Sequence, residues 1–226
     1  CNPCGERTEH FDPIPSTWKK MTDILLFWAR KGVDGFRCDM AEMVPSAFWT
    51  YAIKEVKNEF PYILFIGEVY NPSLYDTYLQ SGFDYLYDKV GMYDCVRGVI
   101  AGTRKPTEIT KQWQATDHIK SKMLYFLENH DEQRIASPFF ANDAEKGFPG
   151  VVVSSLLLPN PFMLYAGQEL GEPGMDAEGF SGRDGRTTIF DYWGIDKLYR
   201  GYYKKNALTA QEKVIWDKYN AILRIA

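Results

Sequence analysis

Three acidic residues of this chain stand at the ends of short apolar segments: Asp39, Glu68 and Asp131. If those segments are parallel strands, their carboxyl ends meet at one mouth, where the side chains can act together. Neighbouring carboxylates raise one another's pKa, which suits one of them to work as a general acid. A protonated and an ionised carboxyl group together form the pair used for glycoside hydrolysis with retention. The three positions therefore predict acid–base and nucleophilic chemistry.

The residues around each acid predict how the work is divided. Arg37 lies two residues before Asp39 and so on the same face of a strand, where it would keep Asp39 ionised. Asp131 follows Asn129 and His130, whereas Glu68 has no nearby cation in the sequence and is expected to be the protonated member. The structural alternative is that Arg37 and Asp39 are a pair at a strand end, that Asp39 and Asp131 cap helices, and that Glu68 is a solvated loop acid.

Five strands must position these residues, and they alternate with helices. The predicted strands are 33–40, 62–66, 83–86, 123–127 and 162–166. The predicted helices are 15–31, 45–58, 73–80, 93–101, 107–114, 145–158 and 209–225. The last helix opens with a capping box, Thr209-x-x-Glu212. Because no hairpin signals separate the strands, the order predicts parallel βα units in a doubly wound sheet or a (β/α) barrel.

Composition narrows the class of protein further. The chain has 226 residues, of which 45% are apolar, and a net charge of −4 with scattered acids. That balance argues against nucleic acid and anionic membranes as partners. Cys1 and Cys4 form one C-x-x-C near His10, which we interpret as an unstructured end or a local disulfide. No metal site is predicted from these residues, and cysteine usage does not decide the redox compartment.

Four segments together resemble the alpha-amylase family of glycoside hydrolases. Gly35–Asp39, Phe65–Val69 and Phe126–Asp131 are similar to its second, third and fourth signature regions, in the family's order. Pro161–Glu169 is similar to its eighth barrel strand. The resemblance runs from about residue 17 onward and implies a parallel (β/α) barrel of TIM type, present here as a partial barrel of about five βα units.

The resemblance also implies roles for the residues that match the signature regions. Asp39 would be the nucleophile that forms a covalent glycosyl-enzyme, and Glu68 the acid/base. Asp131 would stabilise the distorted sugar and the transition state. Arg37 would orient Asp39, and His130 would bind sugar hydroxyls.

Two further substrate contacts are expected beside these residues. The segment Arg186–Trp193 is similar to a loop that some exo-acting relatives carry beside the active site, and Arg186 is its basic residue. Tyr70 and Trp193 are candidate sugar-stacking aromatics. For the loop and for both aromatics, a structural role in packing is the alternative.

The chain lacks recognisable counterparts of several parts of the family's catalytic domain. Residues 1–226 are expected to be the C-terminal part of the barrel, without its first three strands, its inserted small domain and its C-terminal β-sandwich. Glu42 and Met43 stand where the family often has lysine and histidine. The resemblance therefore implies no certain cofactor, with calcium a candidate ligand of the complete enzyme. The partial barrel is expected to be inactive alone and to self-associate through its open edges.

Three interpretations of the function compete. The first is a retaining hydrolase of α-1,4-glucosidic bonds, with starch-like glucans or maltooligosaccharides as the partner. The second is an α-glucosidase, a debranching enzyme or a transglycosidase of the same family, since these share the three carboxylates. The third is a non-catalytic glucan-binding relative. The compartment is not decided by the residues, although the resemblance favours a periplasmic or extracellular site.

Overall fold

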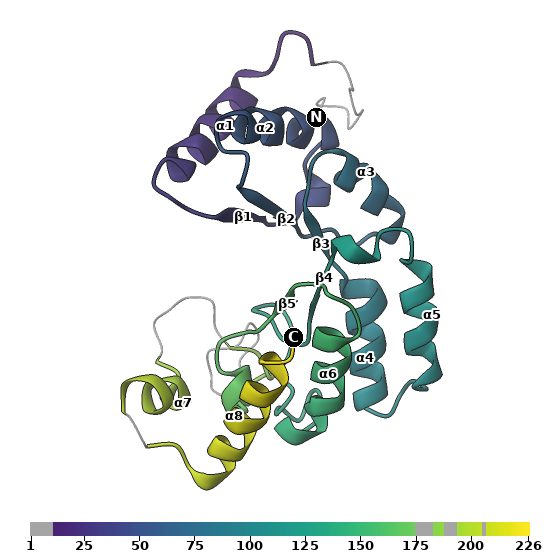
Figure 1. Cartoon of the computed structure of the whole chain (residues 1–226), viewed down its shortest axis with the longest axis vertical. Helices are drawn as coiled ribbons and strands as arrows, with labels where there is room; N and C mark the ends of the chain where they lie inside the picture. Colours follow the sequence, from purple (N-terminus) through teal and green to yellow (C-terminus); the bar gives the residue numbers. More distant parts are fainter. Residues whose placement is uncertain (1–10, 175–182, 188–193, 205–206) are drawn as a thin grey trace. The chain divides into compact units, whose positions relative to one another are not determined.

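A computed structural model describes residues 11–174, 183–187, 194–204 and 207–226. The chain divides into two compact units, Cys1–Tyr87 (unit 1) and Asp88–Ala226 (unit 2). Each unit contains parallel strands that alternate with helices (Figure 1). None of the described helices combines the length and the apolar character needed to cross a bilayer. The predicted βα organisation is therefore confirmed in both units.

Unit 1 contains three parallel strands. Its elements are α1 (Ser16–Ala29), β1 (Gly35–Cys38), η1 (Ala41–Met43), α2 (Ser46–Glu59), β2 (Leu64–Gly67), η2 (Pro72–Leu74), α3 (Tyr75–Gln80) and β3 (Tyr85–Tyr87). In the register of β1 and β2, Arg37 is opposite Ile66. In that of β2 and β3, Ile66 is opposite Tyr85. The ends of the three strands therefore lie next to one another.

The core of unit 1 forms where α2 packs on the sheet. Ala52 and Val56 on α2 and Phe65 on β2 are fully buried, as the helical and strand patterns require. Gly35 opens β1 because a Cβ there would lie 2.7 Å from the carbonyl oxygen of Leu64. Helices α1 and α2 lie side by side (Figure 1), yet α1 keeps Trp28 about half exposed.

Unit 2 contains two parallel strands, and in their register Tyr125 is opposite Phe162. Its helical elements in the first half are η3 (Lys89–Tyr93), α4 (Asp94–Ile100), α5 (Thr107–Ala115) and η4 (Lys120–Lys122). Then come β4 (Met123–Phe126), η5 (Ala144–Gly147), α6 (Phe148–Leu156), β5 (Phe162–Met163), η6 (Gln168–Leu170), α7 (Asp196–Leu198), η7 (Tyr199–Tyr203) and α8 (Ala210–Leu223).

The strongest sequence patterns of unit 2 correspond to its most regular elements. All four residues of β4 are buried, as expected for a strand covered on both faces. The capping box of α8 is confirmed, because the Thr209 hydroxyl accepts from the Glu212 amide and the Glu212 carboxylate accepts from the Thr209 amide. The helix predicted over 145–158 begins at Phe148 and follows a 3₁₀ turn, so that Pro149 occupies its first turn. Strand β5 is shorter than the predicted 162–166.

Candidate active site

The end of β1 brings an arginine and an aspartate together. Arg37 Nη1 lies 2.6 Å from Asp39 Oδ1, so the predicted contact between these side chains is confirmed. The Asp39 side chain is 72% exposed, whereas that of Arg37 is 27% exposed. Asp39 follows the last residue of the strand, so its carboxylate is presented at the strand end with its cation beside it.

Glu68 has the same cation as Asp39, which corrects the expectation that no cation lies near it. Arg37 Nη2 lies 2.8 Å from Glu68 Oε1, at ion-pair distance but without the alignment of a hydrogen bond. The reason is the register: Arg37 is opposite Ile66, and Glu68 follows Ile66 by two residues on the same face. The expectation considered neighbours along the chain only, whereas the cation reaches Glu68 from the adjacent strand.

Three groups hold the buried Glu68 carboxylate, whose side chain is only 4% exposed. Besides Arg37, the Tyr70 hydroxyl donates to Oε1 at 2.9 Å, and the Met40 amide donates to Oε2 at 2.8 Å. The Met40 backbone is left-handed (φ 45°), an uncommon conformation for a residue other than glycine. The turn after Asp39 therefore helps to fix Glu68.

Tyr87, at the end of β3, completes this cluster. Its hydroxyl accepts from Arg37 Nε at 3.3 Å, and the guanidinium carbon of Arg37 lies 5.3 Å from its ring centroid. Burial works against the charge on Arg37. However, the hydrogen bonds to Tyr87 and Asp39 and the charge of Glu68 outweigh burial and raise the pKa of Arg37 further. Arg37 is therefore a permanent cation between two carboxylates.

We call Arg37, Asp39, Glu68, Tyr70 and Tyr87 the Arg37 cluster. It includes four of the residues singled out from the sequence and one that sequence reasoning missed, Tyr87. The signal for Tyr87 was its place at the end of a strand adjacent to the two that carry the acids. Tyr70 stays a candidate sugar-stacking aromatic, and in the structure its hydroxyl donates to Glu68.

In unit 2, His130 and Asp131 follow β4 in a tight turn. His130 Nε2 lies 3.2 Å from Asp131 Oδ2, and both side chains are partly exposed. The Asn129 side-chain nitrogen makes no hydrogen bond among the described residues, and its Oδ1 accepts from the amides of Asp131 and Glu132 at 2.9 and 2.8 Å. Asn129 thus fixes the backbone that presents the two candidate residues.

Arg186 lies beside the same turn. Its Nε donates to the Asp131 carbonyl oxygen at 2.6 Å, and its Nη1 pairs with Asp184 Oδ2 at 3.0 Å. The contact with Asp131 therefore runs through the backbone. Residues 188–193 of the expected loop, including Trp193, lie outside the described residues, as do Cys1, Cys4 and His10.

A buried ion pair that sequence reasoning missed supports this turn. Arg134 Nη1 lies 2.8 Å from Glu128 Oε2, and their side chains are 0% and 2% exposed. Glu128 Oε1 also accepts from the Ile135 amide at 2.7 Å, and Arg134 donates to the Thr187 hydroxyl at 2.8 Å. The sequence feature that could have revealed this pair is the position of Glu128, an acid directly after a fully apolar strand. The pair joins the two ends of the turn that carries His130 and Asp131.

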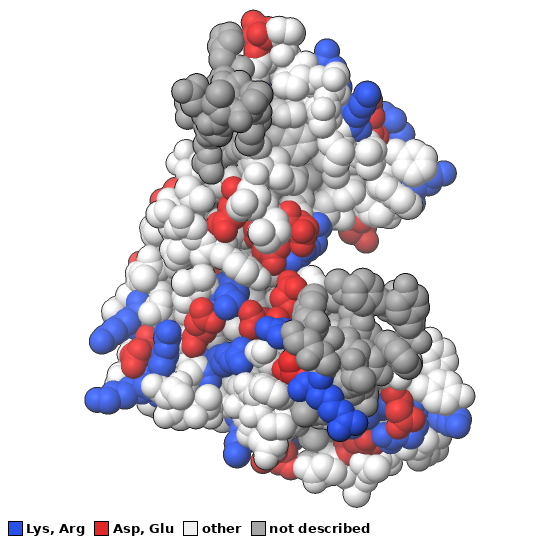
Figure 2. All heavy atoms as spheres, turned by 180° about the vertical axis from the view of Figure 1, so that it is seen from behind, with Lys and Arg blue, Asp and Glu red and all other residues white. Residues whose placement is uncertain are grey.

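The Arg37 cluster belongs to unit 1, and His130, Asp131 and Arg186 to unit 2. Acidic and basic side chains are interspersed over the face shown in Figure 2. The prediction that nucleic acid and membranes are not partners stays a prediction.

Within the described part of the chain, no group of three or more His, Cys, Asp or Glu residues could hold a metal ion. Cys38 and Cys95 are buried free thiols.

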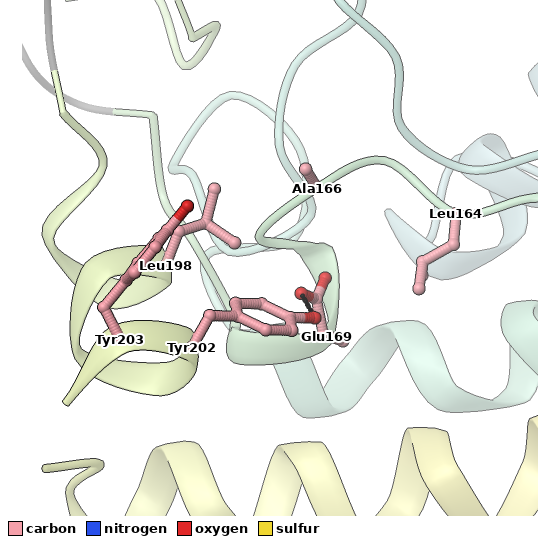
Figure 3. A pocket seen from close by; sticks show the side chains of 6 residues that line it. All are labelled: Leu164, Ala166, Glu169, Leu198, Tyr202 and Tyr203. Atoms are coloured by element: carbon pink, nitrogen blue, oxygen red, sulfur yellow. Dashed lines mark hydrogen bonds between the residues drawn. The ribbon is translucent and has the colours of Figure 1, made fainter. Parts of the chain in front are cut away.

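A separate pocket in unit 2 contains none of the candidate residues. Figure 3 shows its lining, which is formed by Leu164, Ala166, Glu169, Leu198, Tyr202 and Tyr203. The Tyr202 hydroxyl donates to Glu169 Oε1 at 2.8 Å, and burial followed by this hydrogen bond raises the pKa of Tyr202 to about 12. The carboxylate of the pocket is therefore already hydrogen-bonded.

The family model of the alpha-amylase catalytic domain matches residues 14–214. The chain thus belongs to the alpha-amylase family. It is 27% identical over 172 residues to neopullulanase 2 of Thermoactinomyces vulgaris, covering 74% of this chain and 28% of that protein. It is 26% identical over 230 residues to alpha-amylase 3 of Dictyoglomus thermophilum, covering 93% and 46%.

The fold is also similar to that of a solved structure, the cyclic alpha-maltosyl-(1→6)-maltose hydrolase of Arthrobacter globiformis with maltose. The TM-score is 0.70 at 18% identity, over 92% of this chain and 44% of that one. The parallel strands and this similarity make the fold a partial (β/α) barrel of TIM type. The chain spans less than half the length of each of these three proteins.

Proposed function

We propose that the protein containing this chain hydrolyses α-1,4-glucosidic bonds of starch-like glucans or maltooligosaccharides with retention. The observation that carries the proposal is the Arg37 cluster, in which one partly buried cation holds two carboxylates at adjacent strand ends of an alpha-amylase family member. The names of the relatives, a neopullulanase and an alpha-amylase, support a glucan substrate.

In the first step, Asp39 attacks the anomeric carbon while Glu68 gives a proton to the leaving glycosidic oxygen. The bond between that carbon and the leaving oxygen breaks, and an ester between Asp39 and the sugar forms. The exposure of the Asp39 carboxylate supports its role as the attacking group. Arg37 points Oδ1 of Asp39 along a fixed direction, which is a requirement for a nucleophile.

In the second step, Glu68 takes a proton from water, and the resulting hydroxide attacks the same carbon and releases Asp39. The two displacements restore the original anomeric configuration. The burial of Glu68 and its three neighbours hold the carboxyl group in one orientation through both steps. A group that acts first as acid and then as base benefits from such fixed geometry.

Unit 2 supplies the remaining roles in this proposal. Asp131 stabilises positive charge that develops on the sugar ring in the transition state, and His130 donates to a sugar hydroxyl. The 3.2 Å contact between the two side chains and the hydrogen bond from the Asp131 amide to Asn129 support these roles. Arg186 positions Asp131 through its carbonyl oxygen and is also a candidate substrate contact.

The test is to measure maltooligosaccharide hydrolysis by the complete protein and by its Asp39→Asn, Glu68→Gln and Asp131→Asn variants. Each substitution should lower kcat at least about 10³-fold, because each removes a group that contacts the reacting centre. Proton NMR of the first product should show the α-anomer. Glu59→Gln, at an exposed pair with Arg30, is the matched control and should retain activity.

Product analysis separates the related reactions. Hydrolysis predicts shorter maltooligosaccharides only, whereas a transglycosidase would also form longer ones. If the three variants bind maltoheptaose but neither they nor the wild-type protein cleave it, the protein is a glucan-binding relative. We further propose that residues 1–226 alone are inactive and self-associate through open strand edges. Sedimentation velocity and an activity assay of that fragment test both statements.

A further inference from the structure

Glu42 lies three residues after Asp39, in the 3₁₀ turn η1, and its carboxylate is occupied by backbone amides. Oε2 accepts from the amide of Tyr70 at 3.1 Å and from that of Asn71 at 2.9 Å. These two residues belong to the loop that follows Glu68. A carboxylate that accepts from two consecutive amides makes charge-assisted hydrogen bonds and fixes the direction of that backbone.

The turn that carries Glu42 is itself firmly attached. The hydroxyl of the buried Tyr78 donates to the carbonyl oxygens of Glu42 and Val44 at 3.1 and 2.8 Å. The indole of the buried Trp49 donates to the carbonyl oxygen of Ala41 at 3.0 Å. Side chains of α2 and α3 therefore hold the backbone of the turn in place, and the Glu42 side chain extends from it to the loop.

The loop passes this constraint to Glu68 through Tyr70. Glu42 holds the Tyr70 amide, and the hydroxyl of the same residue donates to Glu68 Oε1 at 2.9 Å. Asn71, also held by Glu42, accepts from the amide and hydroxyl of Ser73 and so begins η2. The chain of contacts runs from Glu42 to the loop backbone, from there to the Tyr70 side chain, and finally to Glu68.

We propose that Glu42 is a positioning residue for the acid/base of this enzyme. It acts by fixing the Tyr70 backbone so that the Tyr70 hydroxyl holds the Glu68 carboxyl group in its working orientation. The inference rests on the proposed function and deepens it. Without Glu42, two loop amides lose their acceptor, the loop gains freedom, and proton transfer by Glu68 becomes less efficient.

The leaving group of the substrate provides a test that a merely structural role would not pass. A maltooligosaccharide needs a proton on its leaving oxygen, whereas maltosyl fluoride departs with little help from an acid. In the complete protein, Glu42→Ala should lower the single-turnover rate of the first step on maltooligosaccharide about 10-fold or more. It should change the single-turnover release of fluoride from maltosyl fluoride less than about 3-fold, because neither readout includes the second step, in which Glu68 acts as the base. Glu42→Gln, which keeps one acceptor oxygen, should recover part of the loss.

Two further measurements locate the effect. Hydrogen exchange of the peptide that contains residues 68–74 should be faster in Glu42→Ala than in wild type, because the amides of Tyr70 and Asn71 lose their acceptor. In a Tyr70→Phe background, Glu42→Ala should lower the rate on maltooligosaccharide much less than it does in the wild-type background. The reason is that Tyr70→Phe has already removed the hydroxyl that contacts Glu68. Glu55→Ala, on the exposed face of α2, is the control and should change none of these quantities.

Equal losses on both substrates, full additivity with Tyr70→Phe, or unchanged exchange of residues 68–74 would each overturn the role of Glu42. Failure of the proposed function looks different, because the wild-type protein would then not cleave maltooligosaccharide, or Asp39→Asn and Glu68→Gln would leave its activity intact. If those two variants are inactive while Glu42→Ala behaves like wild type on maltooligosaccharide, only the inference about Glu42 is wrong.

Discussion

Arg37 and Glu68 belong to adjacent parallel strands, and Arg37 Nη2 lies 2.8 Å from Glu68 Oε1. Through its Nη1, the same guanidinium holds Asp39 at 2.6 Å. A single cation therefore sets the spacing between the proposed nucleophile and the proposed acid/base. This relation explains why an arginine, with several donors on a rigid plane, stands at this position.

Arg37→Lys should consequently be a severe substitution in spite of its conserved charge. A lysine has one nitrogen and cannot contact both carboxylates and Tyr87 in the same geometry. We expect kcat of the complete protein on maltooligosaccharide to fall about 10²-fold or more, with a smaller change in KM. Steady-state kinetics check this, with Arg30→Lys at the exposed pair with Glu59 as the control. Near-wild-type kcat in Arg37→Lys would contradict the bridging role.

Arg134→Met should destabilise unit 2 strongly, because it leaves the buried Glu128 carboxylate without its cation. Breaking such a pair costs about 3–5 kcal/mol, measurable as a lower free energy of unfolding in urea. The double variant Arg134→Met/Glu128→Gln should recover part of that loss, since no charge is then left unpaired. In the control, Arg30→Met breaks an exposed pair and should change stability little. A single variant as stable as wild type would refute the prediction.

The hydrogen bonds of Glu212 predict that the protein loses stability in acid. Hydrogen bonds from Arg200, despite opposing burial and with help from Thr209, lower the pKa of Glu212 from 4.5 to about 2. Because the folded-state pKa is depressed, this stabilisation is complete above about pH 4.5 and is lost as the pH falls towards about 2. Glu212→Gln keeps the capping box and should cost about 1–2 kcal/mol at pH 7.

The difference in unfolding free energy between wild type and Glu212→Gln should shrink below pH 4.5. Unfolding curves at several pH values measure it, and the NMR titration of the Glu212 carboxyl carbon gives the pKa directly. Asp217→Asn, at an exposed position of the same helix, is the control. A constant difference between pH 7 and pH 2.5 would show that the charge of Glu212 contributes nothing.

The burial of Asp88 predicts a contribution to stability with the opposite dependence on pH. Burial raises its pKa from 3.8 to about 6, although the amides of Met92 and Gly91 donate to it and oppose the shift. Its Oδ2 is buried and has no hydrogen-bond partner among the described residues. The folded state therefore keeps a proton that the unfolded state releases, and the contribution of Asp88 to stability declines as the pH rises from about 4 to about 6.

Asp88→Asn should remove this dependence, because an amide does not titrate. The unfolding free energy of wild type relative to the variant should fall by about 2–3 kcal/mol between pH 4 and pH 6.5 and then stay constant. Urea unfolding across that range measures the change. If the relative stability is flat over the range, Asp88 does not titrate near pH 6 in the folded protein.

The elements of the fold could be predicted where one local pattern dominates. The apolar run over 123–127 and the capping box at Thr209 each identify an element without tertiary information. Boundaries were less accurate: β5 ends at Met163 because strand length depends on pairing with a neighbour, which the sequence pattern does not specify.

The candidate residues could be found from strand ends and signature order, but their contacts could not. Glu68 receives its cation from the adjacent strand, in which Arg37 pairs with Ile66, two residues before Glu68. Tyr87 was missed for the same reason. Arg134, the partner of Glu128, was missed because the contact depends on how the intervening turn folds back. Contacts between strands follow from register and twist, and these are properties of the folded sheet rather than of a local segment.

The Arg37 cluster has a consequence for the order in which the protein can be made. Its five residues lie between positions 37 and 87, within unit 1, at or just after the ends of three consecutive parallel strands. During synthesis, every residue of this stretch is added before any residue of unit 2. Both proposed reacting carboxylates can therefore acquire their shared cation while the residues that would complete the active site are still being translated.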